Sequence, residues 1–320
     1  MLSAGCDGFL IGMMRHSPTI ENCQLDGLAD DFVNVYSLLL PVYAQVSPTE
    51  LLVAVFPLNG DPTPVLHFVT YGTWRFLDDC KVKSVSAAQQ YTLPDGWSRG
   101  WTMPKRWRGT GFTAGDKVQV LRVVLEKPFS IPPEGVAFSS ESCVNAGTVV
   151  RGCNFRHGAV RGILLQFKDG LIEDNTIHNT LESALLLQCE PSYWGSAITP
   201  RNIVIRGNTL TDTNGRSISH VYSGAIQMGV EGDSKLAEWV SNVTIENNRI
   251  LLPGGSAIAI NGARNVKIIG NRFEQCGNLP WHGKGRQPEK YGIPVAVYAG
   301  EGIEQKDNQA LHTGLYSLDQ

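Results

Sequence analysis

Three carboxylates near the start of the chain are the residues best suited to chemistry. Asp30 and Asp31 are adjacent and lead into the strand-like run Phe32-Val33-Asn34-Val35, and Asp7 precedes them. Two neighbouring carboxylates at the start of a strand cost free energy unless they are solvated, paired with a cation or used in a reaction. Carboxylates held close together raise one another's pKa, so one can keep its proton while another is ionised. Such a group can both donate and accept protons.

The elements that position these carboxylates are predicted from a short recurring phrase. The phrase is an aliphatic residue, two variable residues, Asn, one variable residue, and an aliphatic or aromatic residue. It contains Asn175, Asn208, Asn248 and Asn271, and two further copies carry Cys23 and Cys153 instead of Asn. The interval from 153 to 175 nearly equals that from 248 to 271, while the longer intervals fit one coil plus a loop. Short repeats rich in strand formers and turn residues are typical of solenoids.

This repeat predicts an all-β fold, a right-handed parallel β-helix. Apolar residues alternate within each phrase, which excludes helical repeats. The Asn and Cys side chains are expected to face inward and to stack from coil to coil. Inward Asn side chains can bond turn backbone that would otherwise be buried without a partner. A β-sandwich with chance Asn turns is the alternative.

A long insertion interrupts the repeat between Cys23 and Cys153, and it carries strand signals of its own bounded by prolines. The predicted parts are residues 1–42, the first β-helix coils; residues 43–131, an inserted small β-barrel-like domain; and residues 132–320, the remaining coils. We expect the inserted domain to lean over the acidic residues. Its Trp97, Trp101 and Trp107, with the basic residues among them, pack this domain, bind anions, or offer sugar rings a stacking surface.

Counting from the ladder positions predicts which side chains share a neighbourhood. Asp30 follows the ladder position Cys23 at a fixed offset, and the same count places Asp7 one coil earlier. An offset of seven or eight from the next two ladder positions reaches Arg161 and Glu182. We expect Asp7 to pair diagonally with Asp30 or Asp31, while Arg161 keeps one carboxylate ionised as a base. Glycoside hydrolysis requires such a separation of acid from base. The alternative is an Asp-rich turn with Arg161 as a structural counter-ion.

Seven segments carry a family resemblance. They are Asp7-Gly8-Phe9, Glu21-Asn22-Cys23, residues 27–35, Arg161-Gly162-Ile163-Leu164, Ile172-Glu173-Asp174-Asn175, Tyr193-Trp194 and residues 202–208. Together they resemble family 110 of the glycoside hydrolases, the inverting α-1,3-galactosidases, over most of the chain. The resemblance implies an exo-acting β-helix hydrolase of terminal α-linked galactose, or a related sugar, in oligo- or polysaccharides. It implies no metal and no cofactor, and it makes Asp7, Asp30 and Asp31 the catalytic candidates.

Further residues are candidates for contacts with a carbohydrate substrate. They are Arg161, Glu182, Asn34, Glu190, Trp194 and Trp101. The sequence departs from the family pattern at Ala29, Tyr36 and Glu190. These departures bear on the identity of the sugar more than on the class of reaction.

The overall composition limits the other partners. Lys and Arg number 27 against 30 Asp and Glu, a net charge of −3, so nothing predicts binding to nucleic acid or to an anionic membrane. No apolar run approaches the ~20 residues of a spanning helix. The start does not resemble a signal peptide; truncation of an exported, periplasmic or extracellular protein would explain this, and the localisation stays open. An exposed β-helix end would present unpaired strands and favour a homo-oligomer.

Two other functions fit the same fold. A polysaccharide lyase would use a Lys or Arg base, for which Arg161, Arg216 and Lys284 are available, but it usually needs an acidic calcium cluster that the sequence does not show. A lyase would leave an ultraviolet-absorbing unsaturated sugar. A non-catalytic carbohydrate-binding β-helix would keep its sugar affinity without Asp30 and Asp31 and would turn over nothing.

Overall fold

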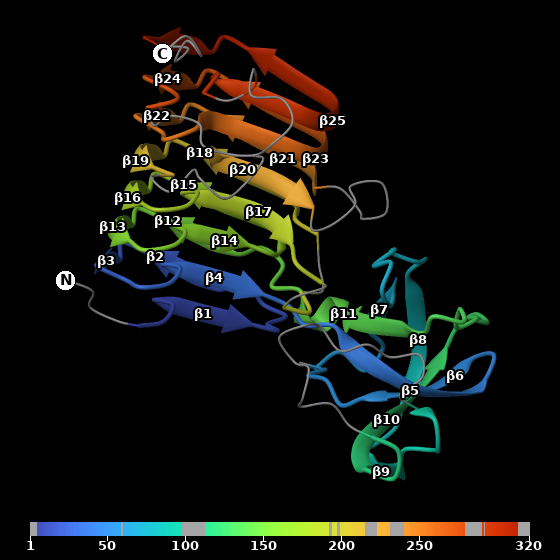
Figure 1. Cartoon of the computed structure of the whole chain (residues 1–320). Coiled ribbons are helices and arrows are strands. Elements are labelled where there is room, and N and C mark those ends of the chain that lie inside the picture. The colour runs from blue at the N-terminus through green and yellow to red at the C-terminus, as the bar shows by residue number, and fades with distance from the viewer. Residues whose placement is uncertain are drawn as a thin grey trace.

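The chain folds almost entirely into β-strands, as the computed structural model shows (Figure 1). The residues that the structure describes are 5–58, 60–97, 113–191, 194–196, 199–214, 223–230, 240–278, 290 and 292–312. None of these residues forms a helix long and apolar enough to cross a membrane. Two bodies are visible, a stack of parallel coils and a smaller antiparallel barrel beside the first coils.

Each coil of the stack contributes strands to three parallel faces. The first face holds β1 (Phe9–Gly12), β4 (Val33–Tyr36), β14 (Ile163–Leu165), β17 (Leu185–Cys189) and β20 (Gly224–Val230). The second holds β2 (Thr19–Glu21), β12 (Val149–Arg151), β15 (Lys168–Glu173), β18 (Arg201–Arg206) and β21 (Val240–Glu246). The third holds β3 (Gln24–Asp26), β13 (Asn154–Gly158), β16 (Thr176–Thr180), β19 (Thr209–Thr213), β22 (Arg249–Leu251), β24 (Arg272–Glu274) and β26 (Gln309–Leu311). The long strands β23 (Ser256–Ile269) and β25 (Val295–Lys306) run through a corner and join the first two faces. The predicted parallel β-helix is confirmed.

The core of the stack lies inside these faces, because alternate side chains of each strand point inward. On β4, Val33 and Val35 are fully buried, whereas Asn34 and Tyr36 are half-buried. Each inward residue aligns with its counterpart in the next coil, as Val33 does with Ile163. The outward residues of the first face are therefore left to form a surface site.

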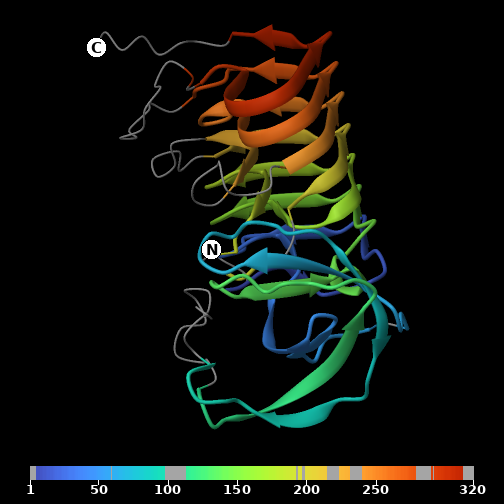
Figure 2. The same cartoon turned by 90° about the vertical axis from the view of Figure 1, so that its right-hand side faces the viewer.

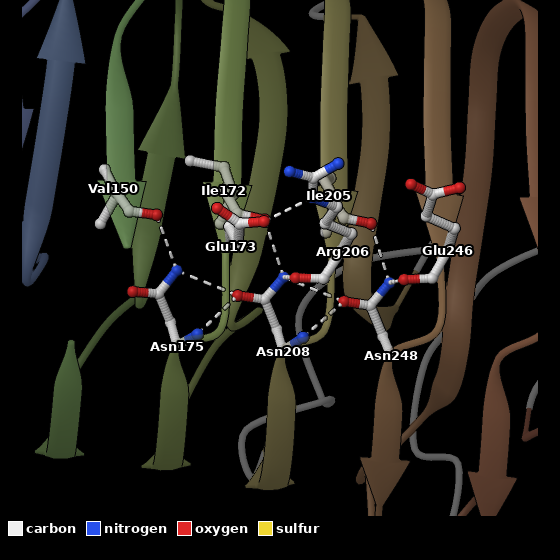
Figure 3. Close-up of polar contacts among 9 residues, drawn as sticks. All are labelled: Val150, Ile172, Glu173, Asn175, Ile205, Arg206, Asn208, Glu246 and Asn248. Atoms are coloured by element: carbon white, nitrogen blue, oxygen red, sulfur yellow. Dashed lines mark hydrogen bonds and ion pairs between the residues drawn. The ribbon is translucent and has the colours of Figure 1, made fainter. Parts of the chain in front are cut away.

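The predicted inward ladder of asparagines is confirmed (Figure 3). Asn208 is about 1% exposed, and its Oδ1 accepts bonds from the backbone N–H and the Nδ2 of Asn175, both at 3.0 Å. Its Nδ2 donates to the Ile172 carbonyl at 2.9 Å. Asn248 and Asn271 repeat the arrangement. The ladder ends at Asn308, which the sequence pattern missed because Gln305 stands where the phrase has an aliphatic residue.

Replacing Asn208 with Ala should lower the free energy of unfolding by about 2–4 kcal/mol, because several buried backbone and amide groups lose their partners at once. Urea unfolding of the variant and of the parent measures this difference. Asn154→Ala is the matched control, since the Asn154 oxygen accepts only an exposed bond from Arg156, at 3.0 Å. A loss no larger for Asn208→Ala than for Asn154→Ala would contradict a structural role of the ladder.

The insertion forms the expected barrel, which lies below the stack of coils in Figure 2. Its strands are β5 (Leu40–Ser47), β6 (Glu50–Ala54), β7 (Val65–Thr70), β8 (Cys80–Val85), β9 (Gln89–Thr92), β10 (Lys117–Leu125) and β11 (Val136–Ser140). The order β6-β5-β11-β7-β8-β10 is closed by pairing of β10 with β6, and β9 pairs with β10. The strands extend beyond the predicted range 43–131 at both ends. Trp97 packs the barrel: its Nε1 donates to the Tyr43 carbonyl at 3.2 Å, and the two rings lie 5.5 Å apart. Trp101 and Trp107 lie outside the described residues.

A charged network joins the barrel to the coils. The buried ring of His67, on β7, contacts Asp79 through Nδ1 at 2.7 Å and Glu141 through Nε2 at 2.9 Å. Glu141 also pairs with Lys168 on β15 of the stack. Burial lowers the pKa of His67, but its bonds to the two carboxylates outweigh burial and raise it overall. The protonated form of His67 therefore stabilises the contact between the barrel and the stack of coils.

This network predicts a pH dependence of stability. The pKa of His67 is raised in the folded protein, so its contribution is complete below about pH 6.5 and is lost as the pH rises through the folded value. Burial opposes ionisation of Glu141, but bonds to His67 and Lys168 lower its pKa to about 2, so its contribution fades as the pH falls below about 4.5. His67→Gln should make the alkaline decline in the urea midpoint smaller. His157→Gln, on an exposed pair with Asp26, is the control, and an unchanged decline in His67→Gln would sink the idea.

Candidate active site

A cavity of about 350 Å³ opens on the outer side of the first face of the stack. Outward residues of neighbouring strands are in register there: Leu10 aligns with Asn34, and Asn34 aligns with Leu164. The loop after β17 contributes Glu190, Trp194 and Ser196 to the lining, and Ser196 pairs through its backbone with Leu38. The lining residues are Asp7, Leu10, Asp30, Asn34, Tyr36, Leu38, Arg161, Leu164, Gln166, Glu190, Trp194 and Ser196.

Carboxylates lie at the end of the cavity where strands β1 and β4 begin. Phe9 pairs with Val33 of the next coil, and the N–H of Gly8 donates to the Asp31 carbonyl at 2.9 Å. Asp7 therefore stacks on Asp31. The count that places Asp7 one coil before Asp30 is therefore off by one residue, because the first coil contains one residue more than the ladder spacing indicates.

The three carboxylates gather around one backbone amide. The N–H of Asp31 donates to Asp7 Oδ1 at 3.2 Å and to Asp30 Oδ1 at 3.1 Å, and Asn34 Nδ2 donates to Asp7 Oδ2 at 3.2 Å. One oxygen from each carboxylate lies within 4.8 Å of the others. We call Asp7, Asp30 and Asp31 the aspartate cluster. Its spacing is tighter than the ~6.5–9.5 Å of an inverting acid–base pair.

Asp31 is the buried member of the cluster. Its side chain is 0% exposed; its Oδ1 accepts from Arg161 Nε at 2.8 Å, and its Oδ2 has no partner among the described residues. Burial raises the pKa of Asp31 to about 7 despite the opposing charge of Arg161. Burial and the neighbouring charge of Asp30 also raise the pKa of Asp7. Arg161 and burial therefore act in opposite directions on Asp31, and the assignment of the base stays a prediction. Burial thus favours the protonated forms of Asp7 and Asp31.

Arg161 connects the cluster to a further carboxylate. Its guanidinium is 13% exposed, and Nη1 lies 3.7 Å from Glu190 Oε1, which also accepts from Gln188 Nε2 at 3.2 Å.

The candidate Glu182 does not line the cavity. Its backbone N–H donates to the Val160 carbonyl at 3.0 Å, and its charge only adds to the attraction that raises the pKa of Arg161.

The structure brings most of the candidate residues together. Those that line the cavity are Asp7, Asp30, Asn34, Arg161, Glu190 and Trp194, with Asp31 directly behind them. Trp101 lies outside the described residues, and none of the described residues of the barrel strands lines the cavity. That the insertion leans over the cluster stays a prediction.

Several lining residues were missed by the sequence. Tyr36 and Leu38 follow Asn34 at the alternating positions of a strand, and this alternation could have indicated them. The Tyr36 ring occupies the space beside Gly12, which has no side chain. A Cβ atom at Gly12 would lie only 2.5 Å from the ring. Gln166 and Ser196 carried no signal, since they meet only through the fold, where Ser196 Oγ donates to Gln166 Oε1 at 3.0 Å.

Among the described residues, the aspartate cluster is also the one group of three acidic, histidine or cysteine side chains close enough to share a metal ion. The guanidinium of Arg161 lies against Asp31. Its positive charge opposes a second cation at the same carboxylate. The cluster therefore fits proton transfer better than metal binding.

Comparison with known proteins defines the class. Residues 134–314 match the family model described as "Right handed beta helix region", and the chain belongs to this family of right-handed β-helices. It is 22% identical over 213 residues to Alpha-1,3-galactosidase A of Bacteroides fragilis, covering 66% of this chain and 32% of that protein. It is 24% identical over 212 residues to Alpha-1,3-galactosidase B of Bacteroides thetaiotaomicron, covering 64% and 28%. The chain thus spans about a third of these relatives or less.

A solved structure gives a much weaker match. It is the Gp54 tailspike of Acinetobacter baumannii bacteriophage AP22 in complex with A. baumannii capsular saccharide. The match covers 92% of this chain and 52% of the tailspike, at 9% identity and a TM-score of 0.19. A score this low carries no argument about this chain.

Proposed function

We propose that this chain is a glycoside hydrolase that removes a terminal α-linked galactose, or a related sugar, from oligo- or polysaccharides. One observation carries the proposal: three carboxylates lie together at the wall of a cavity of about 350 Å³, where burial raises the pKa of Asp31 to about 7. Distant relatives named α-1,3-galactosidases, matched over about two thirds of this chain, support the choice of sugar.

The cluster would supply the two proton transfers of the reaction. Asp7 and Asp30 line the cavity and can touch the substrate, whereas Asp31 is buried behind them and positions Arg161. Because strongly interacting carboxylates titrate as a unit, the proton belongs to the cluster rather than to one residue. One cavity member would protonate the departing glycosidic oxygen, and another carboxylate would accept a proton from the attacking water.

Inversion sets a geometric condition on this reaction. Inverting enzymes hold the two carboxyl groups about 6.5–9.5 Å apart to leave room for water, and retaining enzymes about 5–5.5 Å. Oxygens of the aspartate cluster approach within 4.8 Å. Inversion therefore requires either that the bound substrate separates the working pair or that Glu190, across Arg161, serves as the second carboxylate. We propose inversion on the strength of the family resemblance.

A screen of aryl α- and β-glycosides tests the proposal, with the anomer of the released sugar followed by NMR. The expected result is hydrolysis of an α-galactoside, or of a closely related α-glycoside, with the β-anomer released first. Initial release of the α-anomer would establish retention and reject the inverting part. Absence of turnover on every glycoside, with sugar binding retained, would favour a carbohydrate-binding protein, and an unsaturated product from a uronate polymer would favour a lyase.

A further inference from the structure

The wall of the cavity contains a buried amide that the proposed chemistry does not use. Gln166 follows β14, and its backbone N–H donates to the Val35 carbonyl at 3.1 Å, which fixes the residue beside β4. The residue is about 1% exposed and lines the cavity. Its Oε1 accepts a bond from Ser196 Oγ at 3.0 Å, while its Nε2 has no partner among the described residues.

Turning this amide over does not remove the missing bond. Nε2 would then donate to Ser196 Oγ, and Oε1 would be the atom left unpaired. Native proteins keep few buried polar atoms without a partner, because each one destabilises the fold. A ligand in the adjoining cavity explains why this one persists.

The surroundings of Gln166 indicate what kind of ligand completes the bond. Leu38, Leu164 and Trp194 line the same cavity, and Trp194 is 40% exposed. Such walls suit the C–H faces of a sugar ring. A hydroxyl both donates and accepts, so it satisfies the amide in either orientation. An anionic group would be repelled by Glu190, which lines the cavity too.

A second orphaned atom supports the same ligand. Asn34 donates through Nδ2 to Asp7, so its Oδ1 still needs a donor, and this oxygen is buried without a partner among the described residues. Asn34 aligns with Leu164, two residues before Gln166, so the two amides lie about 7 Å apart along the strand direction. Two side-chain amides on one cavity wall, each with one atom that lacks a hydrogen-bond partner, match a ligand with several hydroxyls.

We propose that Gln166 is a specificity-determining residue that binds one hydroxyl of the sugar through its unpaired amide atom. The inference rests on the proposed function, because it takes a sugar as the ligand. Gln166 makes and breaks no covalent bond in this role. It selects the substrate whose hydroxyl reaches the amide and rejects the analogue that lacks it.

A substrate–variant cycle tests this role. The best glycoside from the aryl-glycoside screen and its monodeoxy analogues are compared by kcat/KM in the parent and in Gln166→Leu. The parent should lose about 10- to 100-fold on one deoxy analogue, because the amide is left unpaired. Gln166→Leu should lose a similar factor on the full substrate, mainly in KM, and should no longer distinguish that analogue. An equal preference in parent and variant for every analogue would overturn the proposal.

Two further variants keep the experiment decisive. Gln166→Met has nearly the same volume and replaces Gln166→Leu in the cycle if the latter does not fold. Gln227→Leu is the matched control: Gln227 Oε1 also accepts from a serine, Ser183 Oγ at 3.1 Å, but Gln227 does not line the cavity. Its discrimination among the deoxy analogues should match that of the parent, and a loss equal to that of Gln166→Leu would overturn the assignment.

Failure of the inference can be told apart from failure of the proposed function. If the parent hydrolyses no glycoside, binding of the same sugars is followed by saturation-transfer NMR. Binding that Gln166→Leu weakens, with loss of discrimination against one deoxy sugar, supports the inference although hydrolysis has failed. Binding that Gln166→Leu leaves unchanged, or no binding by the parent at all, overturns it.

Discussion

Asp30→Asn and Asp7→Asn are each expected to lower kcat by about 10²- to 10⁴-fold, because a positioned proton transfer contributes that much. Both side chains line the cavity, and each accepts a bond from the Asp31 N–H through Oδ1. Asparagine keeps an oxygen at that place but cannot titrate. The fold should therefore persist while turnover is lost, which steady-state kinetics and thermal unfolding of the same samples measure together.

Asp26→Asn is the matched control for these variants. Asp26 lies on β3, is 54% exposed and pairs with His157 at 2.7 Å, away from the cavity. Its kcat should equal that of the parent. Near-parent turnover in both Asp30→Asn and Asp7→Asn would place the chemistry elsewhere in the chain.

Arg161→Met should have the largest combined effect on stability and on the pH profile. Where the pH keeps Asp31 ionised, removing Arg161 should cost about 3–5 kcal/mol, because the buried carboxylate is left as an uncompensated charge. Burial has already raised the pKa of Asp31 to about 7 against the effect of Arg161, so loss of the arginine should raise that pKa further. If the protonated cluster is the acid, parent activity falls as the pH rises through about 7, and the fall should move to higher pH in the variant.

The stability of Arg161→Met should also depend on pH. Asp31 ionises with an ordinary pKa near 3.8 when unfolded and with a raised pKa when folded. The folded protein therefore binds the proton more tightly, and stability falls as the pH rises from about 4 through the raised folded value. Urea midpoints between pH 5 and pH 9 measure this decline in stability. In Arg161→Met the decline should be larger and should continue to higher pH than in the parent.

An exposed arginine gives the comparison for Arg161. Arg151 pairs with Glu21 at 2.9 Å, and both side chains are more than 40% exposed. Arg151→Met should leave the urea midpoint almost unchanged, because exposed ion pairs contribute little to stability. Equal losses in Arg151→Met and Arg161→Met, with no change in the pH profile, would show that Arg161 is not coupled to the cluster.

The ladder shows what a local pattern can predict. Asn175 and Asn208 occupy the same place in two coils, and each coil gives its asparagine the same task, which is to bond buried turn backbone. The requirement is met by a few consecutive residues, so it repeats in the sequence and predicts the β-helix. The recurring phrase fails to predict Asn308. The last coil keeps the asparagine of the ladder, but Gln305 replaces the aliphatic residue three positions before it.

The carboxylates show where counting along the chain stops working. Their identity was predicted, because adjacent aspartates at the start of a strand need a reason to be there. Their stacking was not, since a single additional residue in the first coil exchanges Asp30 for Asp31 as the neighbour of Asp7. The number of residues in a turn between two strands of a coil depends on how that turn packs, and no single residue type in the sequence predicts it.

The sequence by itself therefore determined the repeating coil, the inserted barrel and the three carboxylates, because each follows from residue types that are close together in the chain. Tertiary structure alone decided the burial of Asp31, which raises its pKa to about 7, and the hydrogen bond between Gln166 and Ser196 in the cavity wall. It also decided that His67 of the barrel reaches Glu141 beside the stack. These features depend on contacts between distant segments, and the free energy of such contacts is set by burial and by partners that the neighbouring residues of the sequence do not specify.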